Sequence, residues 1–142
     1  MKLARVMRCA LAASLFSAST SGYPDEGIPT KFEGTWEIQP PPGRPRTNGA
    51  ARIAVIKKNA DGTFEGKMDM GGRMCEMNQA PISGHYDGTQ LEFTGSLTDR
   101  MPNANCWKDI RFVLKRSGSS FEGRAVNINE PVFALRLSPQ EN

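Results

Sequence analysis

The chain repeats one short pattern of a phenylalanine, any residue and a glycine four times. The repeats are Phe32-Glu33-Gly34, Phe64-Glu65-Gly66, Phe93-Thr94-Gly95 and Phe121-Glu122-Gly123. Residues two apart in a β-strand share a face, so each repeat places a large ring beside a bare Cα. A glycine next to a ring leaves room for a neighbour and allows a curved sheet to bend. The pattern predicts four strands whose rings and glycines look into one shared interior.

Alternation of apolar and polar residues extends this pattern to eight strands, and no segment has a helical period long enough to predict a helix. The expected strands are 32–38, 51–58, 63–69, 81–86, 89–97, 106–116, 121–127 and 132–138. Their even spacing predicts an all-β, single-domain, eight-stranded antiparallel up-and-down (meander) β-barrel. Short turns follow the second, fourth and sixth strands, and long connections follow the first, third and fifth. One end is therefore expected to be closed by hairpins, and the other to be a mouth carrying three large loops.

Residues 1–22 have the pattern of a cleaved secretory signal peptide. Lys2, Arg5 and Arg8 precede an apolar stretch at 9–16, and small residues follow. The apolar stretch is too short to span a membrane. The barrel domain is thus expected to comprise residues 23–142 of an exported protein, either periplasmic or secreted.

Loss of this leader changes the charge of the chain. The full sequence has 18 Lys and Arg against 15 Asp and Glu, a net charge of +3. Three of the cations lie in the leader, so the mature chain has 15 of each sign and is neutral. This composition offers no electrostatic basis for binding nucleic acid.

Two of the three cysteines remain in the mature chain, Cys75 and Cys106. An isolated pair in an oxidising compartment most simply forms one disulfide, although two free thiols are the alternative. Both cysteines lie in the expected mouth, where a bond between them would stiffen the loops. Closing a loop of this length stabilises the fold by about 3–4 kcal/mol.

The start of the first strand, Phe32-x-Gly34-Thr35-Trp36, followed by a large loop and a meander, resembles the calycins, the group of lipocalins, avidins and fatty-acid-binding proteins. The resemblance implies a calycin-like barrel that carries or binds a ligand in its interior or at its mouth. It also implies that Trp36 plugs the closed end under a basic side chain from the last strand. Arg136 is the candidate for that side chain.

The leading hypothesis for function is a non-enzymatic binding protein that holds a small apolar or amphiphilic ligand at the mouth. The inward glycines are expected to remove side chains that would otherwise fill the bore. Guanidinium groups suit an anionic end of the ligand, and methionines give adaptable apolar contacts. The candidate ligand-binding residues are Arg44, Arg46, Arg73, Met74, Met77, Arg100 and Trp107. No cofactor is expected, and the alternative for the arginines is an ordinary solvated rim.

Two other functions stay open. The mouth loops of a barrel with a filled core suit a protein partner, as in an inhibitor or interaction module. The methionine-rich stretch 68–77 suits Cu(I), because thioethers are soft ligands, with Met70, Met74 and Met77 as the metal ligands. The alternative for that stretch is apolar cover over the mouth.

No catalytic pattern is present. His85 is the single histidine of the chain and shares a strand face with Ser83. A serine–histidine pair without an orienting acid or an oxyanion hole does not form a hydrolase. We therefore expect that the protein is not an enzyme.

Overall fold

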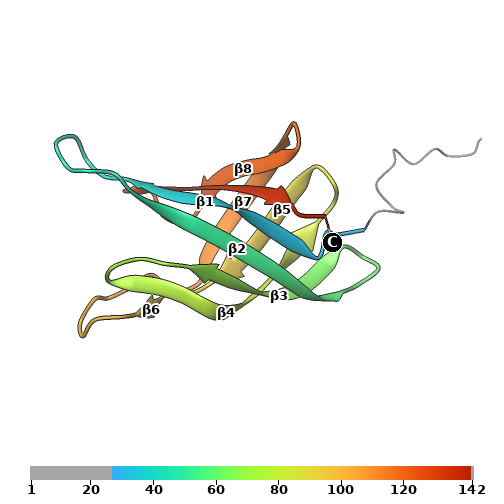
Figure 1. Cartoon of the computed structure of the whole chain (residues 1–142), viewed down its shortest axis with the longest axis horizontal. Helices are drawn as coiled ribbons and strands as arrows, with labels where there is room; N and C mark the ends of the chain where they lie inside the picture. Colours follow the sequence, from blue (N-terminus) through green and yellow to red (C-terminus); the bar gives the residue numbers. More distant parts are fainter. Residues whose placement is uncertain (1–26, 142) are drawn as a thin grey trace, which may run out of the picture.

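The computed structural model describes residues 27–141, which form nine strands and no helix (Figure 1). The strands are β1 Lys31–Gln39, β2 Thr47–Lys58, β3 Thr63–Met70, β4 Cys75–Tyr86, β5 Gln90–Gly95, β6 Thr98–Asp99, β7 Ile110–Ser117, β8 Ser120–Ala125 and β9 Val132–Pro139. The expected signal peptide, residues 1–22, lies outside the described residues.

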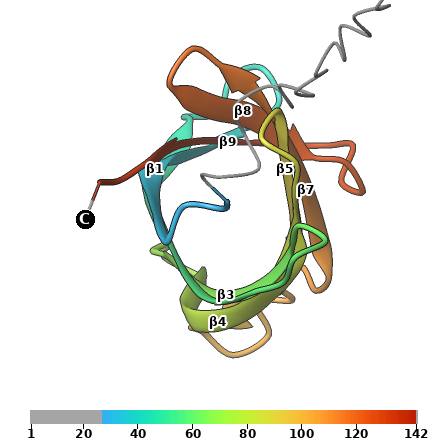
Figure 2. The same cartoon turned by 90° about the vertical axis from the view of Figure 1, so that its right-hand side faces the viewer.

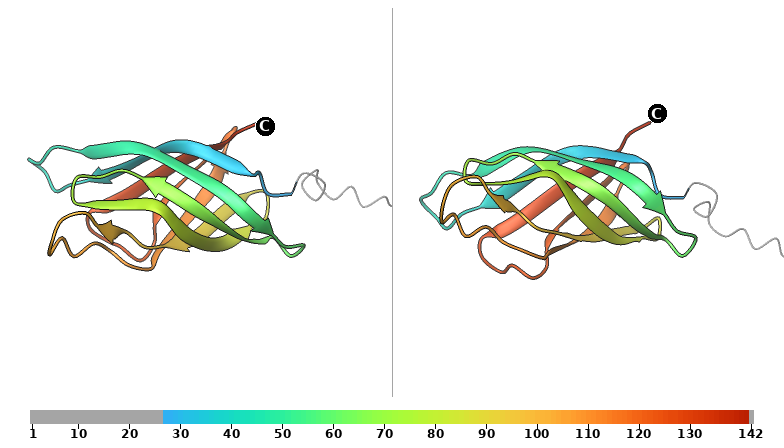
Figure 3. Two further views of the ribbon diagram at one scale, coloured as in Figure 1. Left: turned by 60° about the horizontal axis from the view of Figure 1, so that its bottom comes forward. Right: turned by 90° about the horizontal axis from the view of Figure 1, so that it is seen from below.

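Eight of these strands close into one antiparallel barrel. Each pairs with the next along the chain, β5 pairs with β7, and β9 returns to pair with β1. Figure 2 shows the closed ring of strands from one end, and Figure 3 shows that they cross the barrel obliquely, as closure requires. The two-residue strand β6 stays outside the ring and pairs with the start of β4. The predicted eight-stranded meander barrel is confirmed, with one extra strand.

The connections separate into two kinds at the two ends of the barrel. Hairpin turns join β2 to β3, β4 to β5 and β7 to β8, and the C-terminus lies at the same end (Figure 1). The other end, the mouth, carries the connections 40–46, 71–74, 96–109 and 126–131. The mouth therefore has four connections, because the chain also returns there between β8 and β9.

Strand β4 begins at Cys75, well before the expected start at residue 81. The alternating pattern is interrupted at Gln79, whose φ is 50° and which forms a bulge in the ladder with β3. Pairing continues on both sides of the bulge, so the strand extends further toward its N-terminal end than its pattern indicated. The Asp69 carboxylate accepts hydrogen bonds from the backbone N–H and the side-chain amide of Gln79, at 2.7 and 2.8 Å. These bonds hold the irregular residue in place, so the strand continues past it.

Strand β7 begins at Ile110 rather than at residue 106. Asn105 and Asp109 have φ of 50° and 51°, in the left-handed region, and the ladder with β5 begins only at Ile110, so no pairing continues past them. Residues 103–109 therefore belong to the mouth connection. The expected inward face of the strand is confirmed, since Ile110, Phe112 and Leu114 are fully buried.

The interior is filled by aromatic rings and aliphatic side chains. The phenylalanines of all four repeats are buried in one core, together with Phe112 and Phe133, which confirms the predicted shared interior. The ring of Phe112 lies 5.1 Å from that of Phe93 and 5.2 Å from that of Phe133. Burying each such ring contributes about 1.5–3 kcal/mol to folding.

The glycines of the repeats do not open a bore, and that expectation is wrong. A Cβ at Gly34 would overlap the backbone carbonyl of Arg136, and one at Gly123 would overlap that of Val113. These glycines let neighbouring strands approach closely at tight bends of the sheet. These glycines therefore give no reason to expect an open bore between the packed rings.

Candidate functional site: a pocket at the mouth

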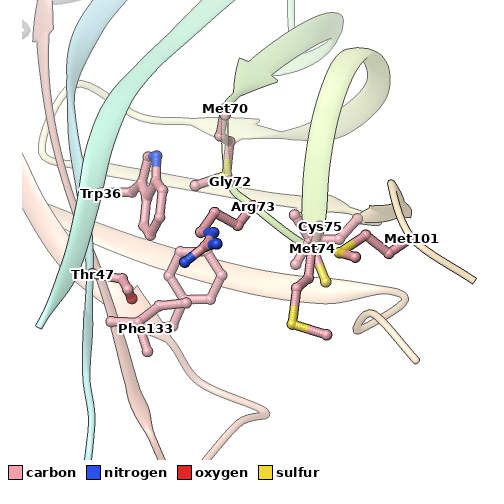
Figure 4. A pocket seen from close by; sticks show the side chains of 12 residues that line it. Trp36, Thr47, Met70, Gly72, Arg73, Met74, Cys75, Met101 and Phe133 are labelled. Carbon is pink, nitrogen blue, oxygen red and sulfur yellow. The ribbon is translucent and has the colours of Figure 1, made fainter. Parts of the chain in front are cut away.

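A pocket of about 530 Å³ lies at the mouth, above the aromatic core (Figure 4). It is lined by Trp36, Ile38, Thr47, Met70, Gly71, Gly72, Arg73, Met74, Cys75, Leu97, Met101 and Phe133. Its volume falls within the range of about 300–1,000 Å³ found for small-molecule sites. Most of the lining side chains are apolar, and Arg73 is the one charged residue among them.

Two rings form the floor of this pocket. Trp36 on β1 and Phe133 on β9 lie 6.2 Å apart, centre to centre. Trp36 is opposite Leu135 and Phe133 is opposite Ile38, so the two rings are diagonal neighbours across the strand pair. Phe133 in turn packs edge-on against Phe112. The floor is thus the uppermost layer of the core, and its shape is held by the packing below it.

The indole N–H of Trp36 is buried and has no hydrogen-bond partner in the described chain. It faces Gly49 on β2, where an added Cβ would lie 2.7 Å from the indole nitrogen. The glycine makes room for the ring edge, so the N–H packs against β2 and the ring presents carbon surface to the pocket (Figure 4).

This placement corrects the role that the calycin resemblance implied for Trp36. The residue lines the mouth pocket rather than plugging the hairpin end. Arg136 does not cover it: its side chain lies on the outer wall and pairs with Glu122 at 3.2 Å.

Two of the mouth connections are fastened together by a disulfide and an arginine. Cys75 and Cys106 are bonded, with their Cα atoms 5.8 Å apart, which confirms the predicted pairing. Arg100 donates from its backbone N–H to Met74 O at 2.8 Å and from its guanidinium to Gly72 O at 2.6 Å. We call residues 71–75 and 98–106 the braced rim. It forms one wall of the pocket and holds that wall in a fixed position.

The four mouth arginines have different environments. Arg46 pairs with Glu37 at 3.3 Å, and Arg100 pairs with Glu76 at 3.6 Å. Arg44 is exposed on the 40–46 connection and does not line the pocket. Arg73 lines the pocket, and in Figure 4 its side chain extends toward Trp36 and Phe133. Among residues 27–141 no acid forms an ion pair with Arg73.

The methionines are arranged differently from the expectation for a Cu(I) site. Met70 and Met74 line the pocket, but Met77 is buried in the core, where its end would meet a Cβ on Gly95. Met101 takes its place in the lining. Sequence reasoning missed Met101, although its position in a predicted mouth loop was the available signal. Cys75 offers no thiolate, since it is in the disulfide.

The described residues contain no group of three or more His, Cys, Asp or Glu side chains placed to hold a metal ion. His85 lies far from the mouth, near the hairpin end, with its Nε2 3.0 Å from the backbone oxygen of Asp61. Trp107 also lies outside the lining, and it supports the pocket indirectly by packing against Phe133 at 5.9 Å.

Two carboxyl groups with displaced pKa values occupy hairpin turns at the end opposite the pocket. The pKa of Asp61 is lowered, chiefly because its carboxylate accepts a hydrogen bond from the Thr63 hydroxyl. The pKa of Asp87 is lowered, chiefly because its carboxylate accepts one from the backbone N–H of Thr89. Both groups cap turns, so their shifts reflect a structural role.

Comparison of the chain with protein-family models, with curated proteins and with solved structures finds no match in any of the three. Among the described residues no helix is long and apolar enough to cross a membrane.

Proposed function

We propose that this chain is an exported, non-enzymatic binding protein of calycin type, which holds a small amphiphilic ligand at the open end of its barrel. The single observation that carries the proposal is the apolar pocket of about 530 Å³ with one cation, Arg73, in its lining. The closed barrel supports the calycin-like assignment, and the Cys75–Cys106 disulfide supports an oxidising compartment.

The chemistry of the lining indicates the chemistry of the ligand. The floor of Trp36 and Phe133 and the walls of Leu97 and three methionines gain from burying apolar surface, at about 0.8 kcal/mol for each methylene. A carboxylate or sulfate suits the guanidinium of Arg73. The ligand class that fits is an apolar chain or ring system ending in one anionic group.

A pair of probes of equal chain length tests both halves of this proposal. Dodecanoate and dodecanol are titrated into the protein, and binding is followed by tryptophan fluorescence, since Trp36 forms part of the floor. Arg73→Gln is expected to weaken dodecanoate binding about fivefold, because a partly solvated charge pair is lost, and to leave dodecanol binding unchanged. Arg44→Gln, on the exposed 40–46 connection, is the matched control and is expected to change neither affinity.

A second variant tests the pocket itself. A Cβ at Gly71 meets no atom within 4 Å, so Gly71→Phe adds a ring at the pocket wall without a backbone clash. The variant is expected to fold normally and to lose affinity for both probes. Unchanged affinity for both in Gly71→Phe and in Arg73→Gln would place the ligand elsewhere and end the proposal.

The filled interior favours one other candidate, an inhibitor or interaction module that acts through the mouth loops. Such a module needs a rigid rim and no bore, and the aromatic core and the braced rim suit it. Native mass spectrometry of protein from an extract distinguishes the two. A bound organic molecule supports the binding protein, and a bare mass together with no probe binding supports the interaction module.

A further inference from the structure

Two apolar side chains project from the mouth beside the pocket. Met74 and Met101 are 53% and 51% exposed, and both also line the pocket. Across residues 27–141 the other exposed large apolar side chains are Ile56, on the wall of β2, and Val126. Neighbouring exposed apolar groups at the entrance of an apolar pocket are typical of an interaction surface.

The braced rim holds these two methionines in place. Met74 is next to the disulfide-bonded Cys75, and its backbone oxygen accepts the N–H of Arg100, the residue before Met101. β6 adds a ladder between Cys75 and Asp99. A contact made by these tips therefore requires little ordering of the loops, which lowers its entropic cost.

Two arginines of the mouth connections, Arg44 and Arg73, form no ion pair with an acid of residues 27–141. The other two, Arg46 and Arg100, are paired with Glu37 and Glu76. The connections 40–46 and 71–74 contain three arginines and no acid. The exposed Asp99 is engaged within the rim, where its carboxylate accepts the backbone N–H of Cys106 at 2.9 Å. Exposed apolar tips flanked by arginines match the boundary between lipid headgroups and acyl chains on an anionic membrane.

The same charges argue against a second copy as the occupant of this surface. Two mouths facing each other would bring like-charged arginines together around the methionines, and that juxtaposition is unfavourable. An anionic lipid surface instead offers phosphates for Arg44 and Arg73 and an acyl layer for Met74 and Met101.

We propose that this protein docks mouth-first on membranes that contain anionic lipids. Met74 and Met101 enter the headgroup region, and Arg44 and Arg73 lie beside the phosphates. The pocket then opens directly onto the lipid, so an amphiphile passes between membrane and pocket without crossing water. The docking surface itself does not depend on the pocket being occupied.

Cosedimentation with vesicles tests this docking. Vesicles of phosphatidylcholine with phosphatidylglycerol are compared with vesicles of phosphatidylcholine alone. The wild-type protein is expected to bind the anionic vesicles more tightly, and added salt is expected to weaken that binding. The double variant Met74→Ser/Met101→Ser is expected to bind anionic vesicles roughly tenfold more weakly, because two apolar tips are lost. Both methionines are more than half exposed, so the variant is expected to keep the wild-type melting temperature.

Ile56→Ser is the matched control. Ile56 is 64% exposed and is followed by Lys57 and Lys58, but it lies on the wall of β2, away from the mouth. It is expected to leave vesicle binding unchanged. An equal loss in this control, wild-type binding by the double methionine variant, or no preference for anionic vesicles would each overturn the proposal. A dimer in sedimentation velocity that the methionine substitutions abolish would assign the surface to self-association instead.

Failure of docking and failure of the binding function give different results. The dodecanoate and dodecanol titrations use no vesicles, so a protein that binds both probes but no membrane retains the proposed function and loses only the docking. A protein that binds anionic vesicles but neither probe retains the proposed docking and loses the proposed ligand-binding function.

Discussion

The Cα of Gly34 on β1 packs directly against the backbone carbonyl of Arg136 on β9, leaving no room for a Cβ between the two strands. Because both partners are backbone, neither moves aside without opening this seam of the barrel. Gly34→Ala is therefore expected to lower the free energy of unfolding by about 3 kcal/mol, measured by urea denaturation. Gly71→Ala, where a Cβ meets open space, is the matched control and is expected to stay near wild type. A Gly34→Ala protein as stable as the control would show that the close approach is not a constraint.

Removing a ring from the aromatic core is expected to lower the free energy of unfolding by a similar amount. Phe112 is fully buried and links the rings of Phe93 and Phe133. Phe112→Ala removes the ring and leaves a cavity under the pocket floor, so the free energy of unfolding is expected to fall by about 3–5 kcal/mol. Phe112→Leu fills most of that cavity and is expected to recover more than half of the loss. Equal losses in the two variants would show that cavity volume does not set the cost.

The disulfide is expected to stabilise both the fold and the pocket. Cys75→Ser/Cys106→Ser releases the closed loop, and the free energy of unfolding is expected to fall by about 3 kcal/mol. Because Cys75 also lines the pocket, affinity for dodecanoate is expected to fall as well, even under conditions where the variant stays fully folded. Reduction of the wild-type protein serves as the control and is expected to reproduce both effects. Wild-type affinity for dodecanoate in the folded, reduced protein would show that the pocket does not depend on the disulfide.

Acid is expected to weaken the hairpin end through Asp87. Its carboxylate accepts hydrogen bonds from Thr89 N, Thr89 Oγ1 and Gln90 N, which lower its pKa below the ordinary value of 3.8. Since the pKa in the folded protein is the lower one, the ionised group stabilises the fold above about pH 4. That contribution is lost as the pH falls through the folded-state pKa.

Thermal melts between about pH 6 and about pH 2.5 measure this effect. Asp87→Asn is expected to be about 1 kcal/mol less stable than wild type at neutral pH, since the bonds are partly solvated, and to lose less stability on acidification. Glu65→Gln, which removes an exposed carboxyl from the outer wall, controls for the loss of one charge. A steeper acid profile in Asp87→Asn than in Glu65→Gln would contradict the assignment.

Local pattern was sufficient to predict most of the strands and the direction in which their side chains face. Phe32, Trp36, Phe64 and Phe93 all face the interior as their alternation indicated, because strand periodicity depends only on neighbouring residues. The predicted strand boundaries were wrong where the backbone is irregular, at the starts of β4 and β7. The bulge at Gln79 depends on Asp69, ten residues earlier in the chain, so the local sequence of β4 does not contain the cause.

The candidate site was predicted in location and only partly in composition. Loop lengths placed the arginines, methionines and cysteines at the mouth, but Arg73, Met74 and Met70 enter the pocket lining while Met77 turns into the core. Met101 and Trp36 joined the lining without having been predicted there. Which side chains converge depends on the height of each residue along the barrel and on the stagger between strands.

The amino-acid sequence by itself therefore determined that this protein is an antiparallel barrel with a hairpin end, a looped mouth and one disulfide, because each of these follows from local periodicity, turn residues or the cysteine count. Only the tertiary structure decided that the interior is filled with rings and that the pocket lies above them. That outcome depends on how closely the strands approach at Gly34 and Gly123, on where Trp36 lies in the register of β1, and on how Arg100 fastens two loops. Such relationships join residues far apart in the chain, and they exist only once the barrel has closed.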